Sequence, residues 1–147
     1  EWNTNFPEWQ DGSWSSRVRL WLNDGNAGLA QSLIVPSWEA RLPLLAAVAD
    51  GPAGALPPAR DGLSLSRAGV LVTAFGQNPD GAGTLLRLWE QAGQSGDCAV
   101  RLPAGCQASV VQPVDLRGQP AGKPIPVKDG QFNVALKPFA PASFVLQ

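Results

Sequence analysis

The stretch that most constrains the fold runs from Gly69 to Glu90. Two apolar runs, Val70–Phe75 and Thr84–Trp89, flank a polar break that contains Asn78-Pro79-Asp80-Gly81. Short runs of β-branched and bulky residues around turn-forming residues predict a β-hairpin with a longer loop. Both runs are apolar on both strand faces, which is typical of strands in the middle of a packed sheet.

The rest of the chain predicts an all-β protein. The 147 residues include 16 Gly and 14 Pro, which are spread along the chain instead of being clustered. This spread favours many short strands joined by turns, and we expect an antiparallel β-sandwich of about 9–11 strands with at most one short helix. The length fits one domain over residues 1–147, with 1–16 as an extended arm and 50–62 as an internal loop.

Individual segments support this expectation. In Arg17–Leu22 the residues alternate, with Val18, Leu20 and Leu22 expected to face inward and Trp21 outward. A turn or two of helix is predicted for residues 27–33, limited by Pro36. Further strands are predicted at Trp38–Arg41, Leu44–Val48, Cys98–Leu102, Ala108–Val111, Gln131–Leu136 and Ser143–Leu146.

Charge and composition exclude several function classes. The net charge of −1 gives no electrostatic basis for binding nucleic acid or an anionic membrane. The chain has no His, which is the commonest metal ligand and the commonest proton shuttle near neutral pH. We therefore expect no metal site and no cofactor in this chain.

Paired carboxylates are the remaining catalytic arrangement, and the candidate pairs are Glu8 with Asp11 and Glu90 with Asp97. Half of the twelve acidic residues, however, are Asp followed by Gly, which is ordinary turn usage. Arg87, Trp89 and Glu90 belong to a strand and are expected to be scaffold, with Trp89 in the core.

The two cysteines, Cys98 and Cys106, leave two interpretations open. A hairpin turning at residues 103–105 would place Cys98 opposite Val110, too far from Cys106 for a disulfide. The sulfurs could still meet if their strands belong to different sheets. The alternative is two small buried thiols.

Aromatic residues provide the better candidates for a binding site. Exposed Trp rings stack on pyranose faces, and the chain has six Trp. Trp9, Trp14, Arg19 and Trp21 are therefore candidates for a carbohydrate-binding site or a domain interface. For Trp21 we favour packing under the N-terminal arm or against a neighbouring domain.

The order of several motifs resembles a known family. Val70–Phe75, the Asp-Gly loop and Leu86-Arg87-Leu88-Trp89-Glu90 are similar to the C-terminal β-sandwich region of the α-mannosidases of glycoside hydrolase family 38. The similarity extends upstream to the entry at residues 2–6 (WNTNF) and to residues 42–45 (LPLL), 54–57 (GALP) and 63–65 (LSL). Downstream it includes residues 113–118 (PVDLRG) and the closing stretch 136–146 (LKPFAPASFVL). Trp89 replaces the family's usual Tyr, and Glu90 often corresponds to Asn.

The resemblance implies a non-catalytic part of a larger glycoside hydrolase. Its expected partner is an upstream catalytic domain of the parent chain, which would hold the zinc ion and the aspartate nucleophile. No catalytic or metal-binding residue of the family matches a position in this chain. The alternative function is an autonomous carbohydrate-binding module that uses exposed Trp residues.

Overall fold

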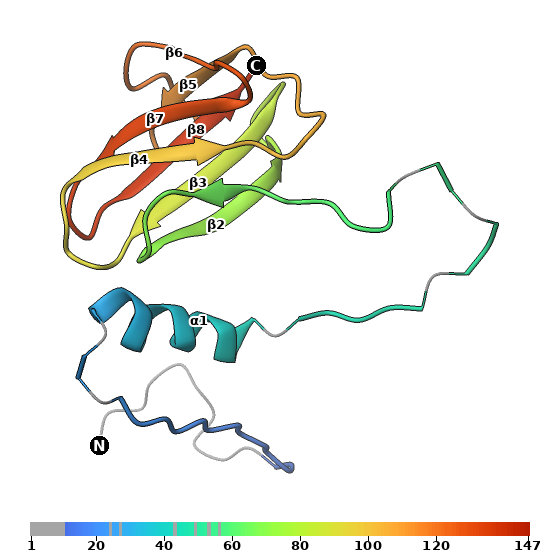
Figure 1. Ribbon diagram of the computed structural model, residues 1–147, viewed down its shortest axis with the longest axis vertical. Coiled ribbons are helices and arrows are strands. Elements are labelled where there is room, and N and C mark those ends of the chain that lie inside the picture. Colours follow the sequence, from blue (N-terminus) through green and yellow to red (C-terminus); the bar gives the residue numbers. More distant parts are fainter. Residues whose placement is uncertain are drawn as a thin grey trace.

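The computed structural model describes residues 11–147 apart from positions 24, 27, 43, 49, 53 and 56 (Figure 1). A π-helical segment and a short α-helix precede the strands. In chain order the elements are η1 (Ala30–Ile34), α1 (Val35–Arg41), β1 (Ser64–Leu65), β2 (Val70–Gln77), β3 (Thr84–Glu90), β4 (Gly96–Arg101), β5 (Val110–Val114), β6 (Ile125–Pro126), β7 (Gln131–Leu136) and β8 (Pro141–Leu146).

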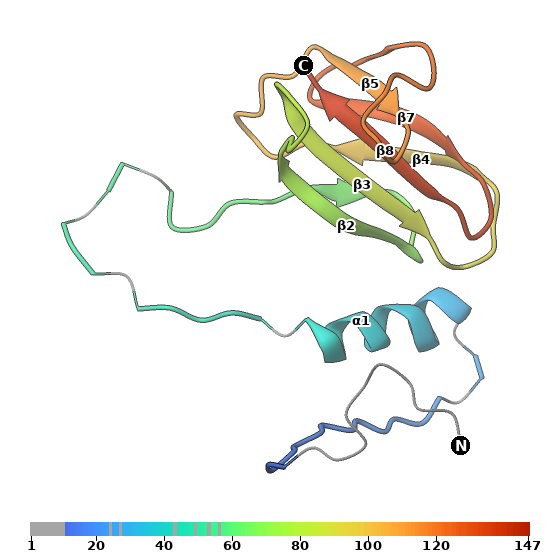
Figure 2. The ribbon, with the colours of Figure 1, turned by 180° about the vertical axis from the view of Figure 1, so that it is seen from behind.

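The strands form two antiparallel sheets. One sheet has the order β1-β4-β7 and the other β2-β3-β8-β5-β6. The sheets lie face to face, with α1 beyond one end of the sandwich in both views (Figures 1 and 2). The predicted all-β antiparallel sandwich with one short helix is therefore confirmed.

The core lies between the two sheets and comes from alternate residues of the strands. In β4 and β7 the inward residues pair in register, Cys98 with Val134 and Val100 with Phe132. Phe132 meets Phe144 of the opposite sheet edge to face, with ring centroids 6.0 Å apart. Successive side chains of a strand point to opposite faces of the sheet, and each inward position here is apolar. This alternation is enough to explain why these side chains of β4 and β7 are buried.

The predicted hairpin is confirmed as β2 and β3, which pair from Val70↔Glu90 to Gln77↔Thr84 with a bulge between Val72 and Ala74. Its loop is closed by the Asn78 N–H, which donates to the Gly83 carbonyl at 3.1 Å. The expectation that both strands lie in the middle of a sheet is wrong for β2, which is an edge strand. Only β3 has neighbours on both sides, because pairing with β8 is a long-range contact that the local pattern does not encode.

The predicted strands of the N-terminal third are wrong in the described part of the chain. Trp38–Arg41 is the end of α1, and neither 17–22 nor the described residues 44–48 form a strand. α1 follows η1 directly, so the helical segment continues past Pro36 and the expected limit at that residue is wrong. As a result the described residues contain eight strands, fewer than the expected 9–11.

The segment that precedes β1 lies outside the two sheets. α1 contacts the sandwich through Trp38, whose Nε1 donates to the Gln91 Oε1 at 3.1 Å. Residues 11–23 lie on the side of α1 away from the sandwich in both views (Figures 1 and 2). The described residues between 50 and 62 form no helix or strand. A search of the described helices finds none with the length and hydropathy of a membrane span.

Candidate domain-contact surface

The sequence-predicted binding residues are only partly brought together. Trp9 lies outside the described residues. Trp14 is 71% exposed, whereas Trp21 is 39% exposed and its Nε1 donates to the Ser32 carbonyl at 3.1 Å. Arg19 and Trp21 line one common groove, which does not include Trp14. The structure therefore unites two of the four candidates.

Two open grooves flank the Trp21 ring. One, of about 450 Å³, lies against the start of the helical segment and is lined by Arg19, Leu20, Trp21, Asn23, Leu29, Ser32 and Leu33. The other lies against α1 and is lined by Arg17, Val18, Arg19, Trp21, Ser37, Ala40 and Arg41. We refer to residues 17–22 and these two grooves as the N-terminal contact surface.

Arginines give this surface a positive character. Arg17, Arg19 and Arg41 line the second groove, and no Asp or Glu lines it. Arg41 lies over the Trp38 ring, 5.6 Å from its centroid. Within the described part of the chain the one ion pair is that between Arg67 and Glu90, so none of the three arginines has a carboxylate partner there. Arg17 and Arg41 were not among the predicted site residues, although alternation places Arg17 on the same strand face as Arg19 and Trp21.

The apolar side chains of the same segment face solvent. Val18, Leu20 and Leu22, expected to be inward, are 78%, 90% and 103% exposed. Most of the exposed large hydrophobic side chains precede residue 50, including Leu44 and Leu45. The expected inward face has no sheet to pack against among the described residues. An exposed run of this kind is typical of a surface that another protein unit covers.

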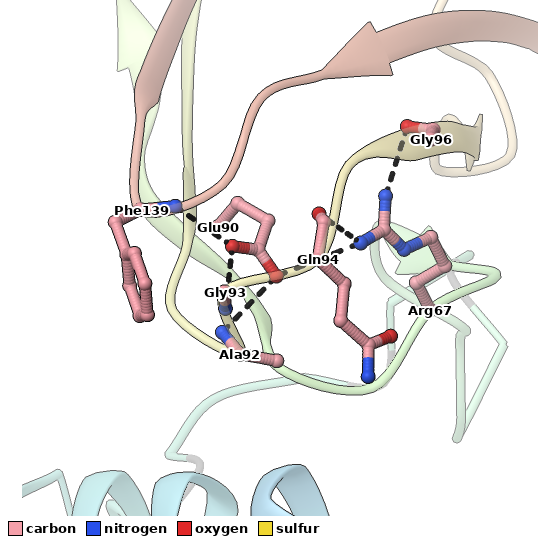
Figure 3. Close-up of polar contacts among 7 residues, drawn as sticks. All are labelled: Arg67, Glu90, Ala92, Gly93, Gln94, Gly96 and Phe139. Carbon is pink, nitrogen blue, oxygen red and sulfur yellow. Dashed lines mark hydrogen bonds and ion pairs between the residues drawn. The ribbon is translucent and has the colours of Figure 1, made fainter.

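The buried polar centre of the sandwich is Glu90, at the end of β3 (Figure 3). Its carboxylate is fully buried and accepts hydrogen bonds from the N–H groups of Ala92, Gly93 and Phe139 at 2.9–3.0 Å. Arg67 Nη2 lies 3.5 Å from Oε1. Because every one of these partners belongs to the scaffold, Glu90 fixes the loop between β3 and β4.

The environment of Glu90 changes its protonation. Burial of the carboxyl group raises its pKa, but hydrogen bonds from the backbone of Phe139, Gln94, Ala92 and Gly93 lower it by more. The net result is a pKa below the ordinary value of 4.5, so the group is ionised at neutral pH. Asp97, its suggested partner in a carboxylate pair, is exposed. Because the carboxylate of Glu90 is buried and that of Asp97 is exposed, the two do not form a catalytic pair on either side of one cleft.

Arg67 completes this centre. Its guanidinium donates to the carbonyls of Gly96 and Gln94 at 2.8 and 2.7 Å (Figure 3). No sequence pattern indicated this contact, because Arg67 lies in the turn before β2 and its partners follow β3. Trp89, expected in the core, is 42% exposed because it points to the outer face of β3, where Nε1 donates to the Phe139 carbonyl at 3.3 Å.

The cysteines are both free thiols, Cys98 buried and Cys106 partly buried against the core. Cys98 pairs with Val134 and not with Val110, since β4 lies between β1 and β7. The simple hairpin across residues 103–105 is therefore wrong. Among the described residues no group of three or more Cys, Asp or Glu side chains could hold a metal ion.

Comparison with known proteins identifies the sandwich. The model of the glycosyl hydrolases family 38 C-terminal beta sandwich domain matches residues 69–140, which run from the start of β2 to the turn before β8. No curated protein and no solved structure gives a significant match. The matched stretch includes the β2–β3 hairpin and Glu90, whose strand contains the motif that carried the sequence resemblance. Residues 69–140, just under half of the chain, are therefore similar to the glycosyl hydrolases family 38 C-terminal beta sandwich domain.

Proposed function

We propose that this chain is the non-catalytic C-terminal β-sandwich of an α-mannosidase-like glycoside hydrolase. It packs on an upstream catalytic domain of the parent protein through the N-terminal contact surface. The observation that carries the proposal is the 78–103% exposure of Val18, Leu20 and Leu22, in a chain whose residues 69–140 match the model of a C-terminal domain. Covering these side chains removes apolar surface from water and stabilises the contact.

A supporting role agrees with the chemistry available in the chain. The sequence lacks His, and its fully buried carboxylate, Glu90, is occupied by backbone N–H groups and Arg67. Retaining glycoside hydrolysis needs two carboxyl groups on either side of the scissile bond. In this proposal both the nucleophile and the zinc ion belong to the catalytic domain.

An activity assay on the isolated chain tests the proposal. We expect no hydrolysis of an aryl α-mannoside, with or without added zinc, while the parent enzyme serves as the positive control. The contact is tested by Leu20→Asp in the parent enzyme, which should lower thermal stability. Leu116→Asp, at a 68% exposed position between β5 and β6, is the control for adding a charge. Turnover by the isolated chain would overturn the non-catalytic assignment.

A second candidate is an autonomous carbohydrate-binding module, favoured by the groove that contains Trp21, Arg19 and Asn23. The hydrogen bond to Ser32 fixes the Trp21 ring while leaving it 39% exposed, as a stacking platform requires. Titration with mannose, galactose or xylose oligomers should then change Trp fluorescence. The change should disappear in Trp21→Ala and persist in Trp89→Ala. An unchanged spectrum contradicts this candidate and leaves the first one standing.

A further inference from the structure

Residues Arg17–Leu22 have the sequence of a β-strand but pair with no strand in the described part of the chain. Their alternation is that of a half-buried strand, with Val18, Leu20 and Leu22 on one face. Within the described part of the chain, residues 17–22 form no backbone–backbone hydrogen bond. Both requirements of a strand, a covered apolar face and paired backbone groups, are therefore unmet among the residues that the structure describes.

The two faces of the segment differ in their surroundings. Trp21 is held against the helical segment by its hydrogen bond to the Ser32 carbonyl, and Arg17 and Arg19 line the groove beside α1. The side chains of Val18, Leu20 and Leu22 are 78–103% exposed to solvent, although Val18 and Leu20 also border the two grooves. The segment lies on the side of α1 away from the sandwich in both views (Figures 1 and 2). The segment thus lies apart from the two sheets, with α1 between them.

The positive charge beside residues 17–22 indicates what kind of surface the partner must have. Arg17, Arg19 and Arg41 line one groove without an ion pair to any described residue. A partner that covers the segment brings these guanidinium groups closer to low-dielectric surroundings, where unpaired cations are unfavourable. The complementary surface therefore has an apolar face for Val18, Leu20 and Leu22 and carboxylates placed to meet the arginines.

We infer that Arg17–Leu22 binds by β-strand addition to an open sheet edge of the upstream catalytic domain, an edge flanked by acidic side chains. The inference rests on the proposed function and specifies how the contact is made. Main-chain hydrogen bonds to an edge strand supply affinity, and alternate side chains supply specificity. The segment is a strand of this chain that completes a sheet of the neighbouring domain.

Amide hydrogen exchange compares the isolated chain with the parent enzyme. In the isolated chain residues 17–22 should exchange freely. In the parent enzyme their protection should rise at least about tenfold, equivalent to about 1.4 kcal/mol of local stability. Adjacent residues of a strand direct their N–H groups to opposite edges. Arg19→Pro and Leu20→Pro therefore remove N–H groups on opposite edges of the strand, and only one of these edges faces the partner. The variant that removes the partner-facing N–H should abolish the protection of residues 17–22 more completely than the other. Leu45→Pro, outside the strand, should leave that protection unchanged.

Each alternative outcome of the hydrogen-exchange experiment has its own interpretation. If 17–22 stays unprotected in the parent enzyme while another surface of this chain becomes protected, strand addition is wrong and the domain contact stands. If no surface gains protection, the proposed function fails as well. Protection of 17–22 in the isolated chain overturns the inference. Protection that does not depend on protein concentration would mean that residues 17–22 pair within their own chain, and protection that rises with concentration would mean that they pair with a second copy.

Discussion

Glu90 and Phe139 are 49 positions apart in the sequence, and the Phe139 N–H donates to the Glu90 carboxylate at 2.9 Å. Phe139 has a positive φ of 55°, a conformation that is uncommon outside glycine. The same carboxylate accepts the N–H groups of Ala92 and Gly93 and lies 3.5 Å from Arg67 (Figure 3). One buried side chain therefore ties together the turns that precede β2, β4 and β8.

Replacement of Glu90 should destabilise the sandwich strongly. Glu90→Ala leaves three backbone N–H groups without their acceptor and Arg67 without its counter-ion. Losing one partner of a buried charged network costs about 3–5 kcal/mol in the free energy of unfolding. Urea denaturation monitored by circular dichroism measures this loss.

The control for this variant is Asp97→Ala, which removes an exposed carboxylate from β4. It should change the free energy of unfolding by no more than about 0.5 kcal/mol. Equal effects of the two substitutions would show that the buried network contributes nothing beyond a generic surface charge.

The same carboxylate makes stability depend on pH. Its pKa in the folded chain lies below the ordinary value of 4.5, so folding favours the ionised form. Above 4.5 Glu90 is ionised in both states and its contribution is complete. As the pH falls below 4.5 the unfolded chain takes up the proton first, and the contribution is lost through the folded-state pKa.

Urea midpoints measured from neutral to acid pH test this linkage. Glu90→Gln cannot titrate, so its stability should fall less steeply below pH 4.5 than that of the wild type. The difference between the two curves isolates Glu90 from the other acidic residues. Parallel curves over the whole range would contradict the lowered pKa.

Gly93 is required for the same turn. It has φ of 72°, and a Cβ added there would lie 2.5 Å from the Phe139 ring. Gly93→Ala should therefore destabilise by about 1–3 kcal/mol, from the left-handed backbone and the displaced ring. Gly76→Ala is the matched control, since that glycine has ordinary φ and open space around its Cα. Thermal unfolding should separate the two variants, and similar midpoints would exclude this packing.

The local sequence pattern was sufficient to predict those strands whose partner strand belongs to the same domain. The hairpin follows from apolar runs around Asn78-Pro79-Asp80-Gly81, and the alternating residues Phe132, Val134 and Leu136 are all buried. Such signals reside within a few residues of each other, so they are readable before the fold is known.

Local pattern failed where a distant partner decides the outcome. Arg17–Leu22 alternates as clearly as Gln131–Leu136, yet it meets no strand among the described residues. Cys98 likewise lies beside β7 and not beside β5, because β4 pairs with β7 along its whole length. The contact between Glu90 and Phe139 joins two turns whose positions only the assembled sandwich defines.

Buried and exposed leucines should differ in how much they contribute to the stability of the isolated chain. Leu88 is fully buried in β3, whereas Leu20 is 90% exposed. In the isolated chain Leu88→Ala should cost about 2–5 kcal/mol in the free energy of unfolding, because it opens a cavity between the sheets. Leu20→Ala should cost no more than about 0.5 kcal/mol, because no described residue packs over that side chain. Urea denaturation of both variants measures the difference. A large effect of Leu20→Ala in the isolated chain would mean that this side chain packs within its own chain and would remove the basis for a contact with another domain.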